Sequence, residues 1–425
     1  MIKTLLEAED FFAERAILGI KPGLERVHAL LEEVGHPERA LKGIHIAGTN
    51  GKGSTANFLM DGLIESGYTV GFFTSPSFSG LRGHMFINHE QISETDFLGV
   101  LNKLLPAIDK LDQAKMEPTE FEIITVLAFM YLEKRADIAV IEAGMGGRFD
   151  TTNCFDPILS IITNVAKDHT AFLGNTIEQI ASHKAGIIKT HRPIITGEMS
   201  DMGLAVIEKE SIEKSAPHYH LGKDFNIYNA NGSHFEWTGK NKKHFVKLTM
   251  HGSHQTQNAA LAIMALELLS ENHIAINVTK AIDAMYSTTV AGRFEVISTQ
   301  PLIVLDGAHN PDGIKAFTAE AADFAKNKQT HIIFSAFKDK EIDKMLDLLQ
   351  KQFEFITLVP FNHPRSMSEN ELAQLASSRG LEFNADWKKT ISAALKAEET
   401  CCTFITGSLH FILRSRAYLL QINGQ

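Results

Sequence analysis

The chain has 425 residues, a length that favours two domains and allows a third, and its 44% hydrophobic and 22% charged residues are ordinary for a globular protein in water. The net charge of -10 argues against non-specific binding to nucleic acid or to an anionic membrane, and three cysteines exclude a disulfide framework and match no zinc motif. Because we see no leader and no apolar run long enough to span a bilayer, we expect a cytoplasmic protein without a membrane partner.

Short apolar runs alternate with helical patterns along most of the chain, which is typical of a parallel α/β sheet. Residues 42–53, KGIHIAGTNGKG, predict a strand that enters a glycine-rich turn, and residues 54–66 predict the helix that follows. Residues 136–147 and 158–169 repeat the pattern of a strand and a polar loop, with Glu142 near the first strand end. Ligands gather at the carboxyl ends of strands in such sheets, so we expect these loops to share one site.

The pattern changes in the second half of the chain. Residues 222–250 alternate in polarity and contain Asn-Gly and Thr-Gly turn signals, which predicts antiparallel strands added to the first domain. After residue 295 a second series of β-rich runs alternates with helical stretches. We therefore expect an α/β protein with a large domain of residues 1–294 and a smaller domain of residues 295–425.

The turn GTNGKGS, residues 48–54, departs from the common phosphate-loop pattern G-x-x-x-x-G-K-[ST]. That pattern requires a glycine and a hydroxyl where this chain has Ile46 and Gly53. The chemistry of a phosphate site is still available, because glycines let backbone N–H groups approach an anion, Lys52 supplies positive charge, and Ser54 or Thr55 supplies a hydroxyl for magnesium. The plainer alternative is a glycine-rich turn without a ligand.

The spelling GTNGKGST resembles the ATP loop of the Mur ligase superfamily, in its branch of folylpolyglutamate and dihydrofolate synthases. The resemblance covers nearly the whole chain as an ordered series of blocks: GIKPGLERV, GTNGKGST, FTSPS, FEIITVLAF, EAGMGGRFDTTN, ITNVAKDHTAFLGNTIEQIA, HKAGIIK, HQTQNAALA, AGRFEVI, VLDGAHNPDG and ITGSLHF. It implies a P-loop-type ATPase domain with a parallel sheet and a small antiparallel sheet, then a Rossmann-like α/β domain, in a protein that is usually monomeric.

The resemblance also implies an ATP-dependent ligase. ATP phosphorylates the carboxylate of a reduced folate or of dihydropteroate, and the amino group of L-glutamate attacks the acyl phosphate. Metal ions and fixed cations stabilise the charge that develops. The catalytic residues are expected to be Lys52, His169, Lys184 and Arg293. The expected ATP-binding residues are Thr49, Asn50, Gly51, Lys52, Gly53, Ser54, Thr55, Asn258, Arg293, Asp306 and His309.

Two magnesium sites follow from the matching blocks. The first would use Ser54, Ser75 and Glu142, which offer the oxygen ligands that a hard cation prefers. The second would use His169 and a carbamylated Lys184, because a lysine ammonium has no acceptor and must react with carbon dioxide before it can bind a cation. Without the resemblance, Glu142 would be a surface carboxylate, His169 a loop or cap residue and Lys184 a solvated charge.

The resemblance assigns Asp306 and His309 of the second domain, with Asn258 and Arg293 of the first, to adenosine and phosphate binding. Arg293 could stabilise charge on the transferred phosphoryl group. The alternatives are a linker charge for Arg293 and a helix N-cap for Asn258. Ser408 could cap the last helix or bind glutamate.

For the pterin, the resemblance points to Phe121, Asp150 and Thr151: an aromatic ring can stack on a flat heterocycle and a carboxylate can accept from its amines. From composition alone, Phe121 would be a core residue.

This chain departs from the family at three positions. Gly83 and His84 replace a glutamate and an arginine in a loop that lies close to folate in the family, and His183 replaces a glutamate before the metal-site lysine. These changes could alter the preference for polyglutamate length or mark a paralogue with another acceptor.

Two other functions compete with this interpretation. A Mur-type ligase with a cell-wall acceptor is disfavoured by the folate-branch blocks FEIITVLAF and HKAGIIK, and by the lack of a uridine-nucleotide domain before the ATP loop. A non-catalytic nucleotide-binding paralogue would be expected to lose metal positions, yet all of them are present.

Overall fold

The computed structural model describes residues 1–77, 79–231 and 233–422. The chain divides into two units, Met1–Leu248 with Thr256–Thr288 and Thr249–Gln255 with Thr289–Gln425. The sequence places its boundary after residue 294, a few residues beyond the division between Thr288 and Thr289. It does not anticipate that a short internal segment, residues 249–255, goes with the second unit.

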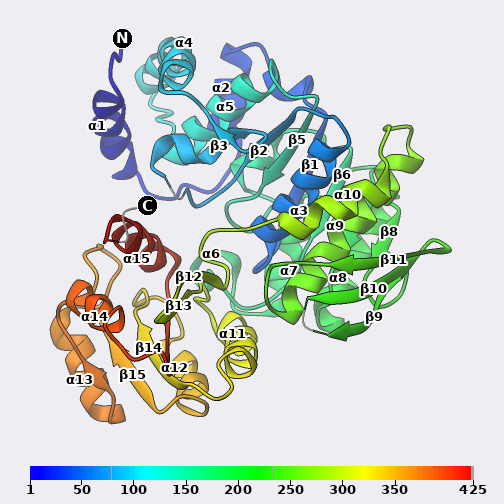
Figure 1. Ribbon diagram of the computed structural model, residues 1–425. Coiled ribbons are helices and arrows are strands. Elements are labelled where there is room, and N and C mark those ends of the chain that lie inside the picture. Colours follow the sequence, from blue (N-terminus) through cyan, green and yellow to red (C-terminus); the bar gives the residue numbers. More distant parts are fainter. Residues whose placement is uncertain (78, 232, 423–425) are drawn as a thin grey trace. The chain divides into compact units, whose positions relative to one another are not determined.

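An eight-stranded sheet forms the centre of the first unit (Figure 1). Its strands are β1 (Gly43–Ala47), β2 (Val70–Phe73), β3 (Met85–Ile87), β4 (Glu90–Gln91), β5 (Ile138–Glu142), β6 (Leu159–Ile162), β7 (Ile194–Thr196) and β8 (His218–His220). They lie in the order β4-β3-β2-β5-β1-β6-β7-β8, and all pairings are parallel except those of β3 with β2 and with β4. The predicted parallel sheet is confirmed.

Helices cover both faces of this sheet. One face packs against α1 (Leu5–Ala16), α2 (Glu25–Glu33), α4 (Glu94–Gln113), α5 (Glu120–Leu132), α7 (Ile177–Ala185) and α8 (Asp201–Glu213). The strand register turns Ile141 and Ile162 toward this face. On the other side α3 (Lys52–Glu65) packs closely against α9 (Ser253–Glu271) and α10 (Val278–Ala284), since a side chain at Gly62 would lie 2.9 Å from Leu266 and 3.3 Å from Ala281.

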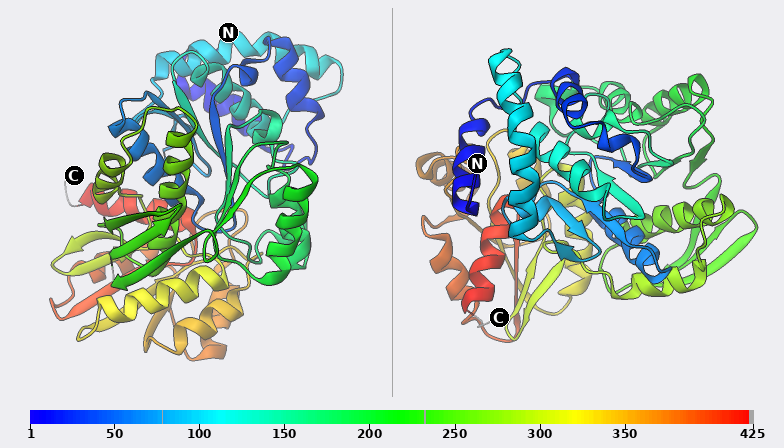
Figure 2. Two further views of the ribbon diagram at one scale, coloured as in Figure 1. Left: turned by 90° about the vertical axis from the view of Figure 1, so that its right-hand side faces the viewer. Right: turned by 90° about the horizontal axis from the view of Figure 1, so that it is seen from above.

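The predicted antiparallel strands form a three-stranded sheet in the order β11-β10-β9, beside α9 (Figures 1 and 2). The strands are β9 (Phe225–Asn231), β10 (His234–Gly239) and β11 (Lys242–Lys247). Buried Trp237 donates from Nε1 to the Ala260 carbonyl of α9 at 3.2 Å. Glu267 of α9 is also buried and pairs with Lys242 and His244, which fixes β11 against the helix.

The second unit has a six-stranded sheet in the order β12-β13-β17-β14-β15-β16. Its strands are β12 (Glu295–Thr299), β13 (Leu302–Leu305), β14 (Gln329–Phe334), β15 (Phe355–Leu358), β16 (Glu382–Phe383) and β17 (Cys401–Thr406). All pairings except that of β12 with β13 are parallel. This is the second α/β series that the sequence predicts.

Successive residues of the strands in the second unit face two hydrophobic cores, one on each side of the sheet. Val304 faces the core made with α11 (Pro311–Phe324), α12 (Ile342–Gln350) and α13 (Glu369–Arg379). Its neighbours Ile303 and Leu305 face the core made with α14 (Trp387–Ala394) and α15 (Leu409–Ile422). Buried on both faces, β13 therefore reads as a continuous apolar run, LIVL.

In the described part of the chain, no helix combines the length and the apolar character needed to cross a bilayer.

Candidate active site

The glycine-rich turn joins β1 to α3, where the sequence predicts it. Gly48 has φ 156°, and a side chain there would lie 1.8 Å from the Thr163 hydroxyl. Gly51 has φ 84°, and a side chain there would lie 2.2 Å from Oδ1 of Asn258. Crowding and backbone conformation thus both require glycine at these positions. The second contact also brings Asn258, which lies inside α9 and so is not a helix N-cap, against the loop.

The loop after β6 holds the turn in place. Oδ1 of Asn164 accepts from the backbone N–H groups of Thr49 and Asn50 at 3.1 and 2.9 Å, and the Thr49 hydroxyl donates to the Ala166 carbonyl at 3.0 Å. The turn that precedes α3 is therefore ordered. The first backbone N–H groups of α3 have no carbonyl partner within the helix, so they are available to bind an anion. Asn164 is missing from the predicted site, although it lies inside the quoted block ITNVAKDH.

A buried acid and a lysine meet beside this turn. Nζ of Lys52 donates to the Gly48 carbonyl at 3.1 Å and lies 4.0 Å from Oε1 of Glu142. Glu142 ends β5 and is only 4% exposed, and its Oε2 accepts from the Thr74 hydroxyl at 2.5 Å. Thr74 is a second residue that the sequence missed, although it directly precedes the predicted ligand Ser75.

The predicted hydroxyl ligands of the first magnesium ion come from α3 and from the segment after β2. Ser54 and Thr55 are buried in the first turn of α3, and the Thr55 hydroxyl has no hydrogen-bond partner within the described residues. Ser75 is half-buried. Among the described residues, no three His, Cys, Asp or Glu side chains lie close enough together to hold a metal by themselves. A cation here would thus be bound by one carboxylate with hydroxyl groups and ligand oxygens.

Lys184 is in the last turn of α7 and is 2% exposed, with no ion pair among the described residues. Burial, followed by the charge of Lys52, lowers its pKa to about 7, against the opposing effect of Asp168 and Asp150. His169 adopts a left-handed backbone (φ 49°), and its Nε2 lies 3.9 Å from Oδ2 of Asp168. A lysine amine that is partly neutral near pH 7 is a nucleophile, which an ordinary surface lysine is not.

The predicted pterin residues lie around the loop after β5. A side chain at Gly144 would lie 2.6 Å from the Phe121 ring and 3.3 Å from Oδ2 of Asp150, so these two residues flank one stretch of backbone. Phe121 is half-buried.

Asp150 is already bonded by its own loop. Its carboxylate accepts from the backbone N–H groups of Met145 and Thr152 at 2.7 and 3.1 Å. Burial raises the pKa of Asp150, and these hydrogen bonds oppose that effect only in part. Next to it, the Thr151 hydroxyl bonds with that of Thr125 at 2.6 Å. These contacts order the loop.

The departures from the family lie in the same region. Nδ1 of His84 donates to the Thr74 carbonyl at 2.8 Å, and its ring centroid lies 6.5 Å from that of Phe121. A side chain at Gly83 would lie 2.4 Å from the Ser77 hydroxyl, so the loop requires a small residue there. The His183 ring meets the edge of the Phe149 ring at 5.7 Å.

The remaining predicted residues belong to the second unit. Asp306 follows β13, is buried, and accepts from the backbone N–H groups of Phe294 and Ala308 at 2.9 Å each. Burial raises its pKa, although the charges of Arg293 and His254 act in the opposite direction. Arg293, Asp306 and His254 therefore form one electrostatic group. His254 is a further residue that the sequence missed, although it opens the quoted block HQTQNAALA.

His309 and Ser408 occupy neighbouring loops of the second unit. Nδ1 of His309 donates to the Gly307 carbonyl at 2.8 Å. Ser408 directly precedes α15, but its buried hydroxyl has no hydrogen-bond partner among the described residues, so it does not cap the helix through its side chain.

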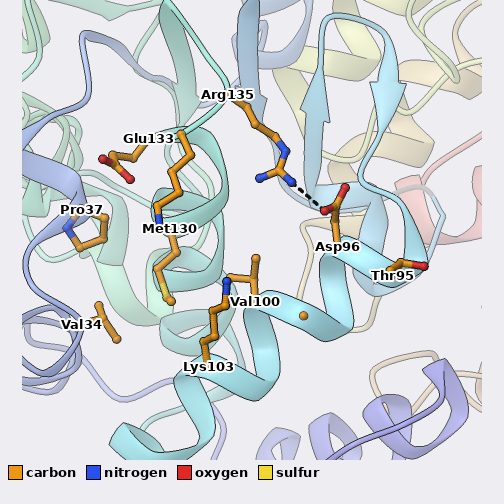
Figure 3. Close-up of a pocket in the computed structure, with 11 residues that line it drawn as sticks. Val34, Pro37, Thr95, Asp96, Val100, Lys103, Met130, Glu133 and Arg135 are labelled. Atoms are coloured by element: carbon orange, nitrogen blue, oxygen red, sulfur yellow. Dashed lines mark hydrogen bonds and ion pairs between the residues drawn. The ribbon is translucent and has the colours of Figure 1, made fainter.

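A surface hollow of about 160 Å³ lies elsewhere in the first unit (Figure 3). Arg135 lines it and pairs with Asp96 at 2.7 Å. Arg135 precedes β5, and Glu142 ends it, so the hollow and the predicted site lie at opposite ends of that strand. The lining, which includes none of the predicted site residues, is Val34, Pro37, Thr95, Asp96, Gly99, Val100, Lys103, Met130, Glu133, Lys134 and Arg135.

Comparisons with protein families and with known proteins identify the same group of relatives. Residues 46–266 match the Mur ligase middle domain, and residues 292–409 match the Mur ligase glutamate ligase domain. The chain is 36% identical over 424 residues to the dihydrofolate synthase/folylpolyglutamate synthase of Bacillus subtilis (strain 168), covering 97% of this chain and 98% of that protein.

Solved structures agree with these sequence matches. The folylpolyglutamate synthase of Thermotoga maritima is 32% identical with a TM-score of 0.85, covering 99% of this chain and 97% of that one. A folylpolyglutamate synthase solved in complex with AMPPCP is 31% identical with a TM-score of 0.84, covering 96% of this chain and 99% of that one.

Proposed function

Because the chain belongs to the folylpolyglutamate and dihydrofolate synthase branch of the Mur ligase family, we propose that it uses ATP to join L-glutamate to the γ-carboxylate of a reduced folate. Dihydropteroate is the second acceptor to consider, because the Bacillus subtilis relative carries both names.

The reaction needs two displacements. A carboxylate oxygen of the acceptor attacks the γ-phosphorus of ATP, and ADP leaves. The amine of glutamate then attacks the carbonyl carbon of the acyl phosphate, phosphate leaves, and the amine gives up a proton. The first step builds negative charge on phosphoryl oxygens, and the second builds it on the carbonyl oxygen of the tetrahedral intermediate and then on the departing phosphate. Preorganised cations and N–H donors are therefore the main means of catalysis.

The observation that carries the proposal is the ordered turn beside Lys52 and Glu142. Asn164 fixes the turn and leaves the first amides of α3 to face a phosphate, while Lys52 adds a positive charge. The related AMPPCP complex supports a nucleoside triphosphate as the ligand of this turn.

Magnesium fits the residues at the first predicted metal site. Glu142, Ser54 and Ser75 offer only oxygen donors, the class that a hard divalent cation prefers, and the Thr74 hydroxyl orients the carboxylate. When bound, the ion would neutralise phosphate charge. Lys52, 4.0 Å from Glu142, adds to that neutralisation.

Lys184 suits carbamylation, with His169 as the other protein ligand of a second magnesium ion. The lysine is buried and makes no ion pair with a carboxylate of the residues that the structure describes, and its lowered pKa leaves a neutral amine fraction able to attack carbon dioxide. ¹³C-bicarbonate should give a carbamate resonance in the wild-type protein and none in Lys184→Met. A resonance that persists in the variant would refute this assignment.

We assign the acceptor to the loops around Phe121, Asp150 and Thr151. The half-buried Phe121 ring can stack on a pterin. Since the loop amides of Met145 and Thr152 already donate to Asp150, its first role is to order this loop. In the second unit, Arg293, Asp306 and His309 are assigned to the nucleotide and Ser408 to glutamate.

The decisive assay measures phosphate release from ATP in the presence of L-glutamate, with dihydropteroate, tetrahydrofolate and tetrahydrofolate carrying one added glutamate as acceptors. We expect glutamate-dependent turnover with at least one reduced folate. Turnover with none of them, or turnover that ignores glutamate, would point to the cell-wall or non-catalytic alternatives.

A further inference from the structure

Three rings form a cluster where the end of β2, the short turn Leu81–His84 and the start of α5 meet. The ring centroid of Phe73 lies 6.1 Å from that of His84 and 6.0 Å from that of Phe121. The His84 and Phe121 centroids are 6.5 Å apart. Phe73 is buried, whereas the other two rings are half-buried. A polar ring therefore lies beside the aromatic ring that is assigned to the pterin.

The His84 ring is held in one orientation. Its Nδ1 donates to the Thr74 carbonyl at 2.8 Å, and the His84 carbonyl accepts from the Thr74 backbone N–H at 3.1 Å. Phe73 stacks against the imidazole with an interplanar angle of 28°. A carbonyl oxygen can only accept, so the proton of the neutral imidazole is on Nδ1. Both the orientation and the tautomer of His84 are thus fixed.

The second ring nitrogen of His84 is an acceptor. Burial lowers the pKa of His84, although the hydrogen bond to Thr74 acts in the opposite direction, so the ring is neutral at pH 7. With the proton on Nδ1, the Nε2 atom carries a lone pair. No group of the described residues donates to Nε2, and this atom is not enclosed by protein. A ligand beside Phe121 that carries an N–H group can therefore donate to it.

The nearby carboxylate of Asp150 is less available to a ligand. Its Oδ1 accepts from both the backbone N–H and the hydroxyl of Thr152, and its Oδ2 accepts from the Met145 backbone N–H at 2.7 Å. Because a carboxylate oxygen has about two lone-pair sites, the loop occupies Oδ1 fully and Oδ2 at least in part. His84 offers an acceptor that the loop does not use.

We propose that His84 determines specificity for the acceptor substrate, with its Nε2 accepting a hydrogen bond from an N–H group of the pterin. This inference rests on the proposed function, which places the pterin against Phe121. The arginine that the resemblance expects at this position has only donors, so the histidine reverses the hydrogen-bonding character of the loop. Every pterin has an amino group and N3–H, whereas N8–H is present only in the dihydro and tetrahydro forms.

The test compares His84→Asn with the control His273→Asn. Asparagine keeps a donor for the Thr74 carbonyl and removes the acceptor at Nε2. His273 is exposed, and its left-handed backbone (φ 64°) is one that asparagine tolerates. Calorimetry measures the binding of 7,8-dihydropteroate with AMPPCP and magnesium present. We expect His84→Asn to weaken binding by about tenfold, because the N–H of the ligand loses its acceptor, and His273→Asn to leave it within twofold.

Pteroate, which lacks N8–H, identifies the N–H group that donates. If N8–H is the donor, His84→Asn should weaken the binding of dihydropteroate and leave that of pteroate unchanged. If the amino group or N3–H is the donor, the binding of both ligands should weaken by a similar factor. Equal binding of both ligands by the wild type and His84→Asn, or an equal loss in His273→Asn, would overturn the role of His84.

A measurement on the wild-type protein does not depend on the stability of a variant. With ¹⁵N-labelled histidine, saturating dihydropteroate should move the Nε2 resonance of His84, and an unmoved resonance would overturn the proposal. Both measurements omit L-glutamate, so a protein that binds pterins without ligating glutamate would refute the proposed function and leave the role of His84 intact. A wild-type protein that binds neither pterin would overturn that role.

Discussion

At the scale of single residues, the most consequential side chain is Lys52, since it lies between the phosphate loop and a buried acid. Its Nζ contacts the Gly48 carbonyl and faces Glu142. We expect Lys52→Ala to abolish glutamate-dependent phosphate release, with a loss of at least about 100-fold, because a charge that stabilises the transferred phosphoryl group is removed. Steady-state kinetics with circular dichroism check this. A folded, fully active Lys52→Ala protein would refute the phosphate role.

His45 gives a pH prediction at the same scale. It is buried in β1, and burial, followed by the charge of Lys189, lowers its pKa to about 3 from 6.5. Between these values the unfolded chain binds a proton that the folded chain does not, so the contribution to stability is complete above pH 6.5 and declines as the pH falls toward 3. At pH 5 the loss is roughly 2 kcal/mol.

We expect His45→Gln to lose this part of the pH dependence. Urea unfolding at pH 7.5 and pH 5 measures it in a Trp387→Phe background, where Trp237 reports on the first unit. An unchanged difference between the two pH values would show that His45 does not remain neutral in the folded protein.

At the scale of elements, the phosphate loop depends on a partner loop far along the chain. Asn164 accepts from two consecutive loop amides. We expect Asn164→Ala to raise the KM for ATP by about tenfold, because two hydrogen bonds that order the turn are lost, each contributing on the order of 1 kcal/mol. Asn175→Ala, an exposed residue nearby in sequence, is the control. Equal KM values for the two variants would mean that the turn is ordered without Asn164.

The small sheet offers a second test at this scale. Glu267 is fully buried in α9 and pairs with Lys242 and His244 of β11. Glu267→Ala leaves that lysine and histidine without their carboxylate, and we expect a loss of about 3 kcal/mol in stability. Exposed Glu271, which pairs with Lys240, is the matched control, with an expected change below about 1 kcal/mol for Glu271→Ala. Urea unfolding followed by Trp237 fluorescence measures both, and equal losses would contradict the prediction.

At the scale of the whole molecule, nucleotide binding should be visible as stability. A ligand that binds only the folded state at 100 times its dissociation constant adds about 2.7 kcal/mol. We expect AMPPCP with magnesium to raise the melting temperature, AMPPCP with EDTA to raise it less, and Lys52→Ala to remove most of the shift. Differential scanning fluorimetry checks all three. A shift that EDTA leaves unchanged would argue against the magnesium site at Glu142.

The sequence by itself determined the parts of this protein that local chemistry dictates. Glycines at 48 and 51, a lysine and a hydroxyl predict a phosphate turn because only backbone freedom and charge are required. Apolar runs that end in polar residues predict the parallel strands of both units, because a strand buried on both faces must be continuously apolar.

Only the tertiary structure decided which distant residues meet. The contacts of Asn164 with the turn span more than a hundred residues, as the separations of 114 and 115 positions show. Thr74 reaches Glu142 because β2 pairs with β5, and Lys184 loses its solvent because α7 packs on the sheet. Such meetings depend on strand order, register and helix packing, which no local periodicity encodes. Burial also lowers the pKa of Lys184, and the burial of a side chain cannot be read from the sequence around it.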